Sequence, residues 1–182
     1  MCDEQVIRHC APTLARLKTA NMFTCPFDSR EEMLQSVRLL NKRLQRKGLC
    51  VLPLRYRKGL GLIYVFRPAK LADDLSDQTA RSLLSACGYR CQSTAQYLRC
   101  LMARLEADGE FPHEIGLFLG YPPEDVEGFM RCPNGCKCCG CWKVYGDAEK
   151  ARRTFARYRK CADVYMRLWA QGRSIERLTV AG

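Results

Sequence analysis

The densest group of reactive side chains in this sequence is a run of cysteines at residues 132–141. Its five thiols belong to Cys132, Cys136, Cys138, Cys139 and Cys141. Two C-x-x-C pairs overlap within the run, and such a turn lets two thiolates converge on one tetrahedral zinc at about 2.3 Å. An iron–sulfur cluster uses the same ligand types. We therefore predict a metal site in this cysteine-rich loop, with zinc favoured over iron–sulfur and metal-free loop thiols as the alternative.

The residues around these thiols are compatible with metal binding but do not complete a second ligand pair. Gly135 and Gly140 would give the loop the backbone freedom that a zinc knuckle needs. Lys137 and Lys143 add positive charge, which lowers thiol pKa values. The chain has 13 cysteines, an odd number, so a complete disulfide framework would leave one thiol over.

The two histidines raise the separate hypothesis of a thiol enzyme. His113 is expected in the first turn of a short helix beside Glu114, where the helix N-terminus favours a neutral imidazole. Cys10 and His113 could form a nucleophile–base pair, since such partners are often distant in sequence. No nucleophile motif of a known protease class surrounds Cys10, and we expect His9 to point away from Cys10 in an extended segment. The candidate catalytic residues are Cys10, His113 and Glu114, with helix capping by His113 as the structural alternative.

Size, composition and charge limit the class of protein. The chain has 182 residues, of which 47% are apolar and 27% charged, which suits one soluble domain. No apolar run approaches the roughly 20 residues of a membrane span. The N-terminus lacks the features of a signal peptide, so we expect a cytoplasmic protein whose thiols are kept reduced.

The formal charge of +11 favours an anionic partner such as nucleic acid. The long helix expected from about Asp147 to Gln171 carries a crowd of basic side chains. They belong to Lys150, Arg152, Arg153, Arg157, Arg159 and Lys160. A solvated basic surface is the alternative interpretation.

The elements that position these residues follow from hydrophobic periodicity and turn signals. We expect a strand over 20–25, a helix after the capping box Ser29–Glu32, and a hairpin of 49–56 with 61–66. Pro53 places the first hairpin strand at an edge or a bulge. The later segments read as helices over 68–87, 94–105, 112–119, 123–130 and 147–171. The sequence thus predicts an α+β single domain, 1–182. Its portion 1–70 would hold a small sheet of one strand plus a β-hairpin packed by helices, and its portion 71–182 would be mostly helical.

Two neighbouring stretches, Phe111–Phe129 and Gly140–Asp147, together with His9–Leu14, resemble a bacterial family known from anaerobic Firmicutes. This family is catalogued as domain of unknown function 3793, and the resemblance covers essentially the whole chain. It implies no activity, but it directs attention to a set of polar and aromatic residues. These are His9, Cys10, Thr13, His113, Glu114, Trp142, Lys143 and Tyr145. The chain is richer in cysteine than the family pattern, which weakens the expectation of a metal site shared across the family.

Taken together, these features favour a cytosolic accessory protein in metal or redox handling that binds zinc or an iron–sulfur cluster through Cys132 to Cys141. The alternatives are a nucleic-acid-binding protein that uses the basic final helix and a Cys/His thiol enzyme. Trp142, Lys143 and Tyr145 are the candidate cofactor-binding residues, although Trp142 and Tyr145 are also natural core anchors. No substrate or reaction is predicted.

Overall fold

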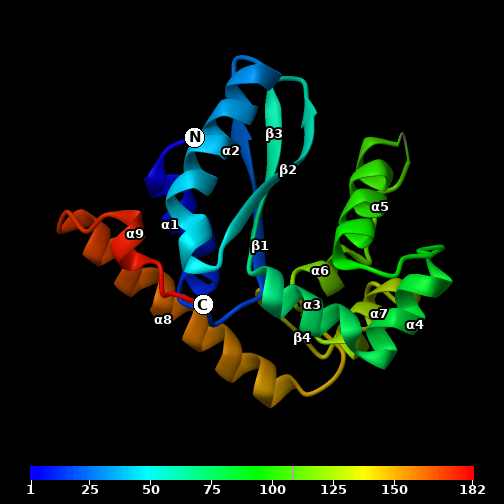
Figure 1. Ribbon diagram of the computed structural model, residues 1–182. Helices are drawn as coiled ribbons and strands as arrows, with labels where there is room; N and C mark the ends of the chain where they lie inside the picture. Colours follow the sequence, from blue (N-terminus) through cyan, green and yellow to red (C-terminus); the bar gives the residue numbers. More distant parts are fainter. Residues whose placement is uncertain (108) are drawn as a thin grey trace. The chain divides into compact units, whose positions relative to one another are not determined.

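The chain folds into two compact units. The computed structural model describes residues 1–107 and 109–182. Unit 1 contains Met1–Ala69 and Tyr158–Gly182, and unit 2 contains Lys70–Arg157. The predicted α+β class is confirmed, because helices accompany a small antiparallel sheet (Figure 1). Unit 1 contains residues 1–69 of the expected α/β portion 1–70 and, in addition, residues 158–182.

Unit 1 is built around a three-stranded sheet in the order β1-β3-β2. Its strands are β1 (Ala20–Pro26), β2 (Cys50–Arg57) and β3 (Leu60–Phe66), and its shorter helices are α1 (Asp3–Leu14), α2 (Arg30–Leu44), η1 (Gln45–Lys47) and α9 (Ile175–Leu178). All pairings are antiparallel, with Phe23 opposite Ile63 in β1–β3 and Val51 opposite Val65 in β2–β3. The strand and the hairpin predicted from the sequence are therefore confirmed.

The hairpin turn and the edge strand follow from particular residues. Lys58 and Gly59 both have positive φ, 52° and 76°, which is the backbone that a two-residue hairpin loop requires. Pro53 lies on the edge strand β2, and the register shifts between Pro53 and Arg55, so both expectations for this proline are confirmed. Asn41 of α2 protects the edge by exchanging two 2.8 Å hydrogen bonds with the backbone of Val51.

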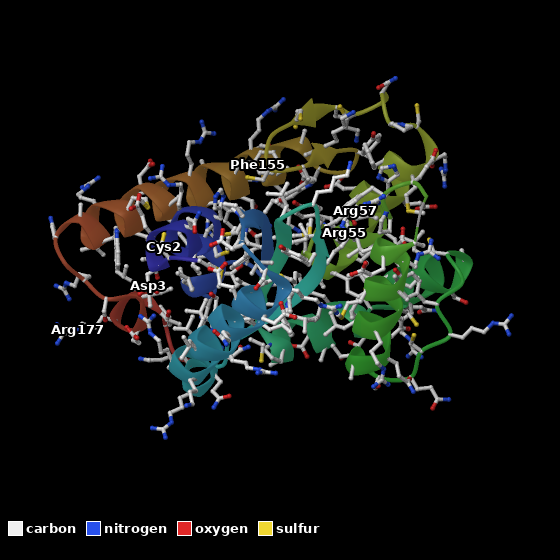
Figure 2. All side chains as sticks on the ribbon, turned by 90° about the horizontal axis from the view of Figure 1, so that it is seen from above. Cys2, Asp3, Arg55, Arg57, Phe155 and Arg177 are labelled. Carbon is white, nitrogen blue, oxygen red and sulfur yellow. The ribbon has the colours of Figure 1, made fainter. Side chains whose placement is uncertain are left out.

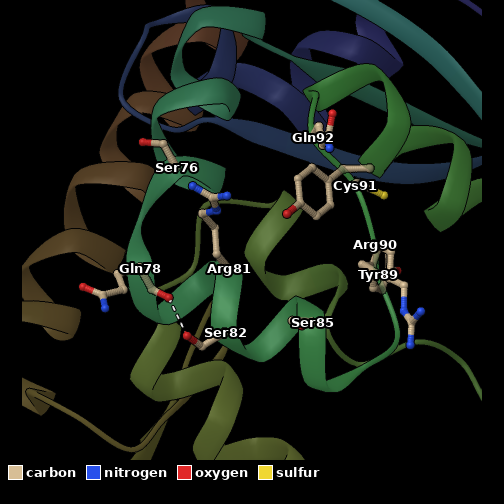
Figure 3. Close-up of a pocket in the computed structure, with 10 residues that line it drawn as sticks. Ser76, Gln78, Arg81, Ser82, Ser85, Tyr89, Arg90, Cys91 and Gln92 are labelled. Carbon is tan, nitrogen blue, oxygen red and sulfur yellow. Dashed lines mark hydrogen bonds between the residues drawn. The ribbon is translucent and has the colours of Figure 1, made fainter.

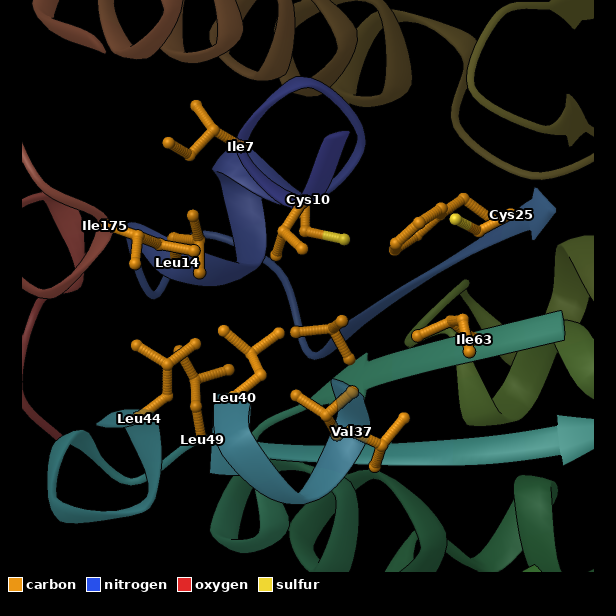
Figure 4. Packing of buried hydrophobic residues seen from close by; sticks show 14 of the residues in the cluster. Ile7, Cys10, Leu14, Cys25, Val37, Leu40, Leu44, Leu49, Ile63 and Ile175 are labelled. Atoms are coloured by element: carbon orange, nitrogen blue, oxygen red, sulfur yellow. The ribbon is translucent and has the colours of Figure 1, made fainter. Parts of the chain in front are cut away.

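One hydrophobic core joins these elements in unit 1 (Figure 4). Ile7, Cys10 and Leu14 contribute from α1, and they face apolar side chains from α2, the sheet and α9. Their spacing of three and four residues is that of one helix face. The expectation that His9 and Cys10 lie in an extended segment is therefore wrong: α1 carries both, with Cys10 buried and His9 exposed and stacked on Phe23 at 5.0 Å.

Arg67 holds the ends of unit 1 together through backbone carbonyls. Its guanidinium is buried and donates to the carbonyl oxygens of Thr13, Leu14, Lys47 and Val180 at 2.8–3.2 Å. Burial lowers the pKa of Arg67 to about 10. One cation thus connects α1, the segment after α2 and the residues that follow α9.

Helix caps confirm several boundaries predicted from the sequence. Ser29 Oγ accepts the Glu32 N–H at 3.1 Å at the start of α2, but the Glu32 carboxylate accepts from Asp28 N rather than from Ser29 N. The helix predicted over 94–105 is confirmed as α5, and Ser93 and Gln96 form a complete capping box at its start. The helical stretch expected over 68–87 is broken at Asp77, because this carboxylate accepts the Ala80 N–H at 2.9 Å and starts a new helix.

Unit 2 is mostly helical and contains a short two-stranded ladder. Its elements are α4 (Gln78–Ala86), α5 (Thr94–Glu106), α6 (Ile115–Phe118), α7 (Pro123–Arg131), β4 (Cys138–Cys139) and β5 (Lys143–Val144), with most of α3 (Pro68–Ser76) and the first part of α8 (Ala148–Ala170). The helix expected over 112–119 is shorter than predicted and begins at Ile115, so His113 lies before it rather than in its first turn. Among the described helices, none is both long enough and apolar enough to cross a bilayer.

Candidate functional site

A buried carboxylate, Asp125 of α7, organises the segment that carries the ladder β4–β5. Asp125 Oδ2 accepts the indole N–H of Trp142 at 2.7 Å, and Oδ1 accepts the backbone N–H groups of Tyr145 and Gly146, each at 2.7 Å. A hydrogen bond to a charged acceptor is stronger than a neutral one and contributes about 1.5–3 kcal/mol. Asp125 therefore fixes the position of Trp142, Tyr145 and Gly146 relative to α7.

Asp125 lies in the first turn of α7, where a carboxylate also complements the helix dipole. Its side chain is only 3% exposed and is bonded to residues 17 to 21 positions further along the chain. The one local signal is an acidic residue beside the buried Val126 in an amphipathic helix.

A pocket of about 320 Å³ lies between α6, α7 and the β4–β5 segment of unit 2. Aromatic and aliphatic side chains make most of its wall, and one imidazole and one ammonium group accompany them. The lining residues are His113, Ile115, Gly116, Tyr121, Asp125, Val126, Phe129, Trp142 and Lys143. An apolar cavity near 300 Å³ with a few convergent polar groups is typical of a small-molecule site.

The rings in this wall are held by one another. Trp142 stacks on Tyr121 at 4.9 Å and meets Phe155 of α8 edge-on at 4.5 Å. His113 meets Phe129 edge-on at 4.9 Å. Since the indole is fixed by Asp125 and by two rings, the wall is rigid where a ligand would contact it.

Of the residues of unit 2 singled out by the family resemblance, three meet in this pocket, and Glu114 and Tyr145 do not line it. His113, Trp142 and Lys143 share the wall. Glu114 is 3% exposed and points elsewhere, where its carboxylate accepts from Tyr89 Oη at 3.0 Å and from Arg104 Nε at 2.7 Å. Glu114 is therefore a buried carboxylate that ties the start of α6 to α5.

Tyr145 acts as a brace for the cysteine-rich loop rather than as a wall of the pocket. Its backbone binds Asp125, and its hydroxyl donates to the carbonyl oxygen of Cys132 at 2.8 Å. Desolvation raises the pKa of Tyr145, and the nearby thiols of Cys136 and Cys132 add to this effect. The backbone N–H and the hydroxyl of Tyr145 therefore link the cysteine-rich loop to α7.

The ladder β4–β5 separates the cysteines of residues 132–141. Cys138 pairs with Val144 and Cys139 with Lys143, and neighbouring residues of a strand point to opposite faces. Cys138 accordingly packs against the small cluster of Val144, Ala151 and Phe155. Among residues 1–107 and 109–182, no three His, Cys, Asp or Glu side chains are grouped so that they could hold a metal ion.

Gly140 has a packing role in this ladder. A Cβ at this position would lie 2.2 Å from the ring of Phe155, so only glycine lets α8 approach the turn between β4 and β5. The freedom expected for a zinc knuckle is therefore not needed to explain Gly140. Metal binding by Cys132, Cys136, Cys138, Cys139 and Cys141 stays a prediction.

Comparison with family models matches residues 6–179 to the family described as "Protein of unknown function (DUF3793)". The chain belongs to this family. Comparison with curated proteins finds no match, and comparison with solved structures finds none either. Two of the three stretches on which the resemblance rests, Phe111–Phe129 and Gly140–Asp147, together contain every residue that lines the pocket of unit 2.

Cys10, the candidate nucleophile of this DUF3793 protein, is enclosed in the core of unit 1. Its side chain is 0% exposed, and burial raises the pKa of its thiol far above the usual range. A reactive cysteine needs both access and an accessible thiolate. The environment of Cys10 is that of a core residue.

The six basic residues of α8 named above are all exposed. Other elements also carry exposed or half-exposed cations, among them Arg55 and Arg57 of β2 and Arg177 of α9 (Figure 2). Binding of nucleic acid by the α8 face stays a prediction, and it does not account for the pocket of unit 2.

Proposed function

We propose that unit 2 binds a small molecule that has a flat apolar body and one anionic group. The observation that supports this function is the pocket of about 320 Å³ whose rigid aromatic wall ends at the ammonium group of Lys143. The apolar body would lie against Trp142, Phe129 and Val126. The anionic group would lie beside Lys143 and His113.

The charges around the pocket favour an anion over a cation. Lys143 Nζ donates to the carbonyl oxygen of Pro133 at 2.7 Å and lies 5.3 Å from the centre of the Phe129 ring. An ammonium group has three donors, so this one bond leaves capacity for a ligand. The opposing charge of Asp125 is already bound by three N–H groups, which neutralise much of its effect on a ligand.

A pair of related dyes tests both halves of this proposal. Anilinonaphthalene sulfonate has the required shape and charge, and N-phenylnaphthylamine has the same ring system without the sulfonate. We expect the folded protein to bind the sulfonate dye more tightly. Lys143→Met should weaken sulfonate binding about 5- to 10-fold, which corresponds to the roughly 1 kcal/mol of a partly exposed charge pair, and should leave the neutral dye unaffected.

Lys137→Met is the matched control. Lys137 lies on the same loop, and its ammonium group likewise donates to a backbone carbonyl, that of Gly146 at 2.8 Å, but it does not line the pocket. Equal losses for the two variants would contradict a specific role for Lys143. Failure of both dyes to bind would contradict the pocket as a site for this ligand class.

We also propose thiolate metal binding as a second function of the cysteine-rich loop, with zinc ahead of an iron–sulfur cluster. The supporting observation is the 2.8 Å hydrogen bond from the Tyr145 hydroxyl to the Cys132 carbonyl oxygen, which holds the start of the loop, and the thiols of Cys136 and Cys132 both help to raise the pKa of Tyr145. These two sulfurs would be the first ligands of the metal. Elemental analysis of anaerobically purified protein, before and after reconstitution, tests this proposal, and the absence of both zinc and iron would overturn it.

A further inference from the structure

The Cys91 and Cys100 sulfurs form a close thiol pair in unit 2, apart from the apolar pocket. Cys91 lies in the segment between α4 and α5, and Cys100 lies on α5. Their sulfur atoms are 3.3 Å apart, and both side chains are half-buried. A disulfide bond is about 2.05 Å long, so the two sulfurs must approach by only about 1.2 Å to form one.

Cys91 also forms part of the wall of a large polar groove. This groove has a volume of about 980 Å³ and is lined by residues of α4 and of the segment that follows it, including Arg81, Tyr89 and Gln92 (Figure 3). A small polar reagent in the groove can therefore reach Cys91. The pair thus has a route to an oxidant that a core thiol such as Cys10 lacks.

The segment next to Cys91 is tied to the start of α5. Gln96 Oε1 accepts the backbone N–H groups of Gln92 at 2.6 Å and of Ser93 at 3.2 Å. These bonds keep Cys91 close to the first turns of α5, where Cys100 follows. The contact between the two sulfurs is therefore supported by hydrogen bonds that hold the neighbouring backbone in place.

We propose that Cys91 and Cys100 form a reversible dithiol–disulfide pair that reacts with low-molecular-weight disulfides. One cysteine, as thiolate, attacks a sulfur of the disulfide RSSR, forms a mixed disulfide and releases RS⁻. The second cysteine loses its proton and attacks the protein sulfur of the mixed disulfide, which releases the second RS⁻. The two protons lost by the cysteines end on the two released thiolates, so two protein thiols are oxidised and one RSSR is reduced to two RSH.

The environment of the pair sets how its reactivity depends on pH. Burial, followed by the hydrogen bond with Cys100, raises the pKa of Cys91 to about 11. Only the thiolate is the nucleophile, so oxidation should speed up as the pH rises toward that value. We therefore expect the pair to react slowly at neutral pH, unlike an activated catalytic thiol.

Peptide mapping of the full-length protein tests the proposal directly. Reduced protein is equilibrated with mixtures of reduced and oxidised glutathione, free thiols are alkylated, and the protein is digested with trypsin. Arg90, Arg99 and Arg104 provide cleavage sites, so an intramolecular disulfide links Cys91–Arg99 to Cys100–Arg104. The linked product is identified by its mass, and its amount is followed across the redox series.

We expect this linked product to exceed oxidation of Cys87 by on the order of tenfold, because two thiols held in contact react with a high effective concentration. Cys87 is the matched control, since it is also half-buried in unit 2. Cys100→Ser should leave Cys91 able to form only a mixed disulfide with glutathione, while Cys87→Ser should not change the linked product. Oxidation of the pair no greater than that of Cys87, or pairing of Cys91 with many cysteines in similar amounts, would overturn the proposal.

Discussion

Replacement of Asp125 by asparagine tests whether one carboxylate holds the β4–β5 segment on α7. Asparagine has nearly the same size, and its carbonyl oxygen can still accept the N–H groups of Tyr145 and Gly146. Its amide group would then face the indole N–H of Trp142, so that a donor meets a donor where the carboxylate now accepts at 2.7 Å.

The expected cost can be worked out from this lost contact. A hydrogen bond to a charged group contributes about 1.5–3 kcal/mol, and a buried donor without an acceptor adds to the loss. The remaining two bonds also weaken, because their acceptor is no longer charged. We expect Asp125→Asn to lower the free energy of unfolding of unit 2 by about 2–3 kcal/mol.

Urea denaturation followed by tryptophan fluorescence can measure this change. The sequence has two tryptophans, and Trp169→Phe leaves Trp142 as the reporter of unit 2. Glu127→Gln on the same helix is the control, because its exposed ion pair with Arg131 contributes only about 0.5 kcal/mol. If Asp125→Asn were no more destabilising than Glu127→Gln, the three bonds to Asp125 would not be what holds this segment.

Three further predictions concern unit 1 and the cysteine-rich loop. The hydrogen bond from Arg43 lowers the pKa of Glu176 from 4.5 to about 2, so the stability that this pair contributes is complete above pH 4.5 and is lost as the pH falls toward 2. Glu176→Gln should therefore flatten the pH dependence of the melting temperature between these values. An unchanged profile would contradict the pairing. Arg67→Met should lower the free energy of unfolding by about 3 kcal/mol in urea denaturation, because four bonds from a buried cation are lost, and a change under about 1 kcal/mol would refute that role. Cys136→Ser should reduce the zinc content of anaerobically purified protein, whereas the exposed Cys2→Ser should not, and equal zinc in both variants would count against the loop as the site.

The sequence predicted elements whose signals are local. The helix over 94–105, the hairpin of 49–56 with 61–66 and the place of Pro53 each depend on nearby residues, and the structure confirms all three. Helix α1 was missed although its apolar residues have helical spacing, because Pro12 lies inside it and argues against a helix.

The candidate site was less predictable because it depends on contacts between distant residues. His113, Trp142 and Lys143 were each singled out, but nothing local shows that they share one pocket. The bond from Trp142 to Asp125 spans 17 residues, and the approach of α8 to Gly140 depends on the packing of Phe155. The contact of Cys91 with Cys100 likewise crosses a loop and two turns of helix, where neither residue forms a familiar spacing motif.

Unit 1 is made of two segments that are separated in the sequence by unit 2, and this order affects how the protein folds during synthesis on the ribosome. Lys70–Arg157 emerges as one continuous stretch, so unit 2 can complete its fold while the last residues of unit 1 are still missing. Until Ile175 and Leu178 arrive, the core face of α1 lacks part of its cover, and Arg67 lacks the Val180 carbonyl. The sheet can form early, but the core of unit 1 must persist without its full cover until the segment that follows unit 2 closes it.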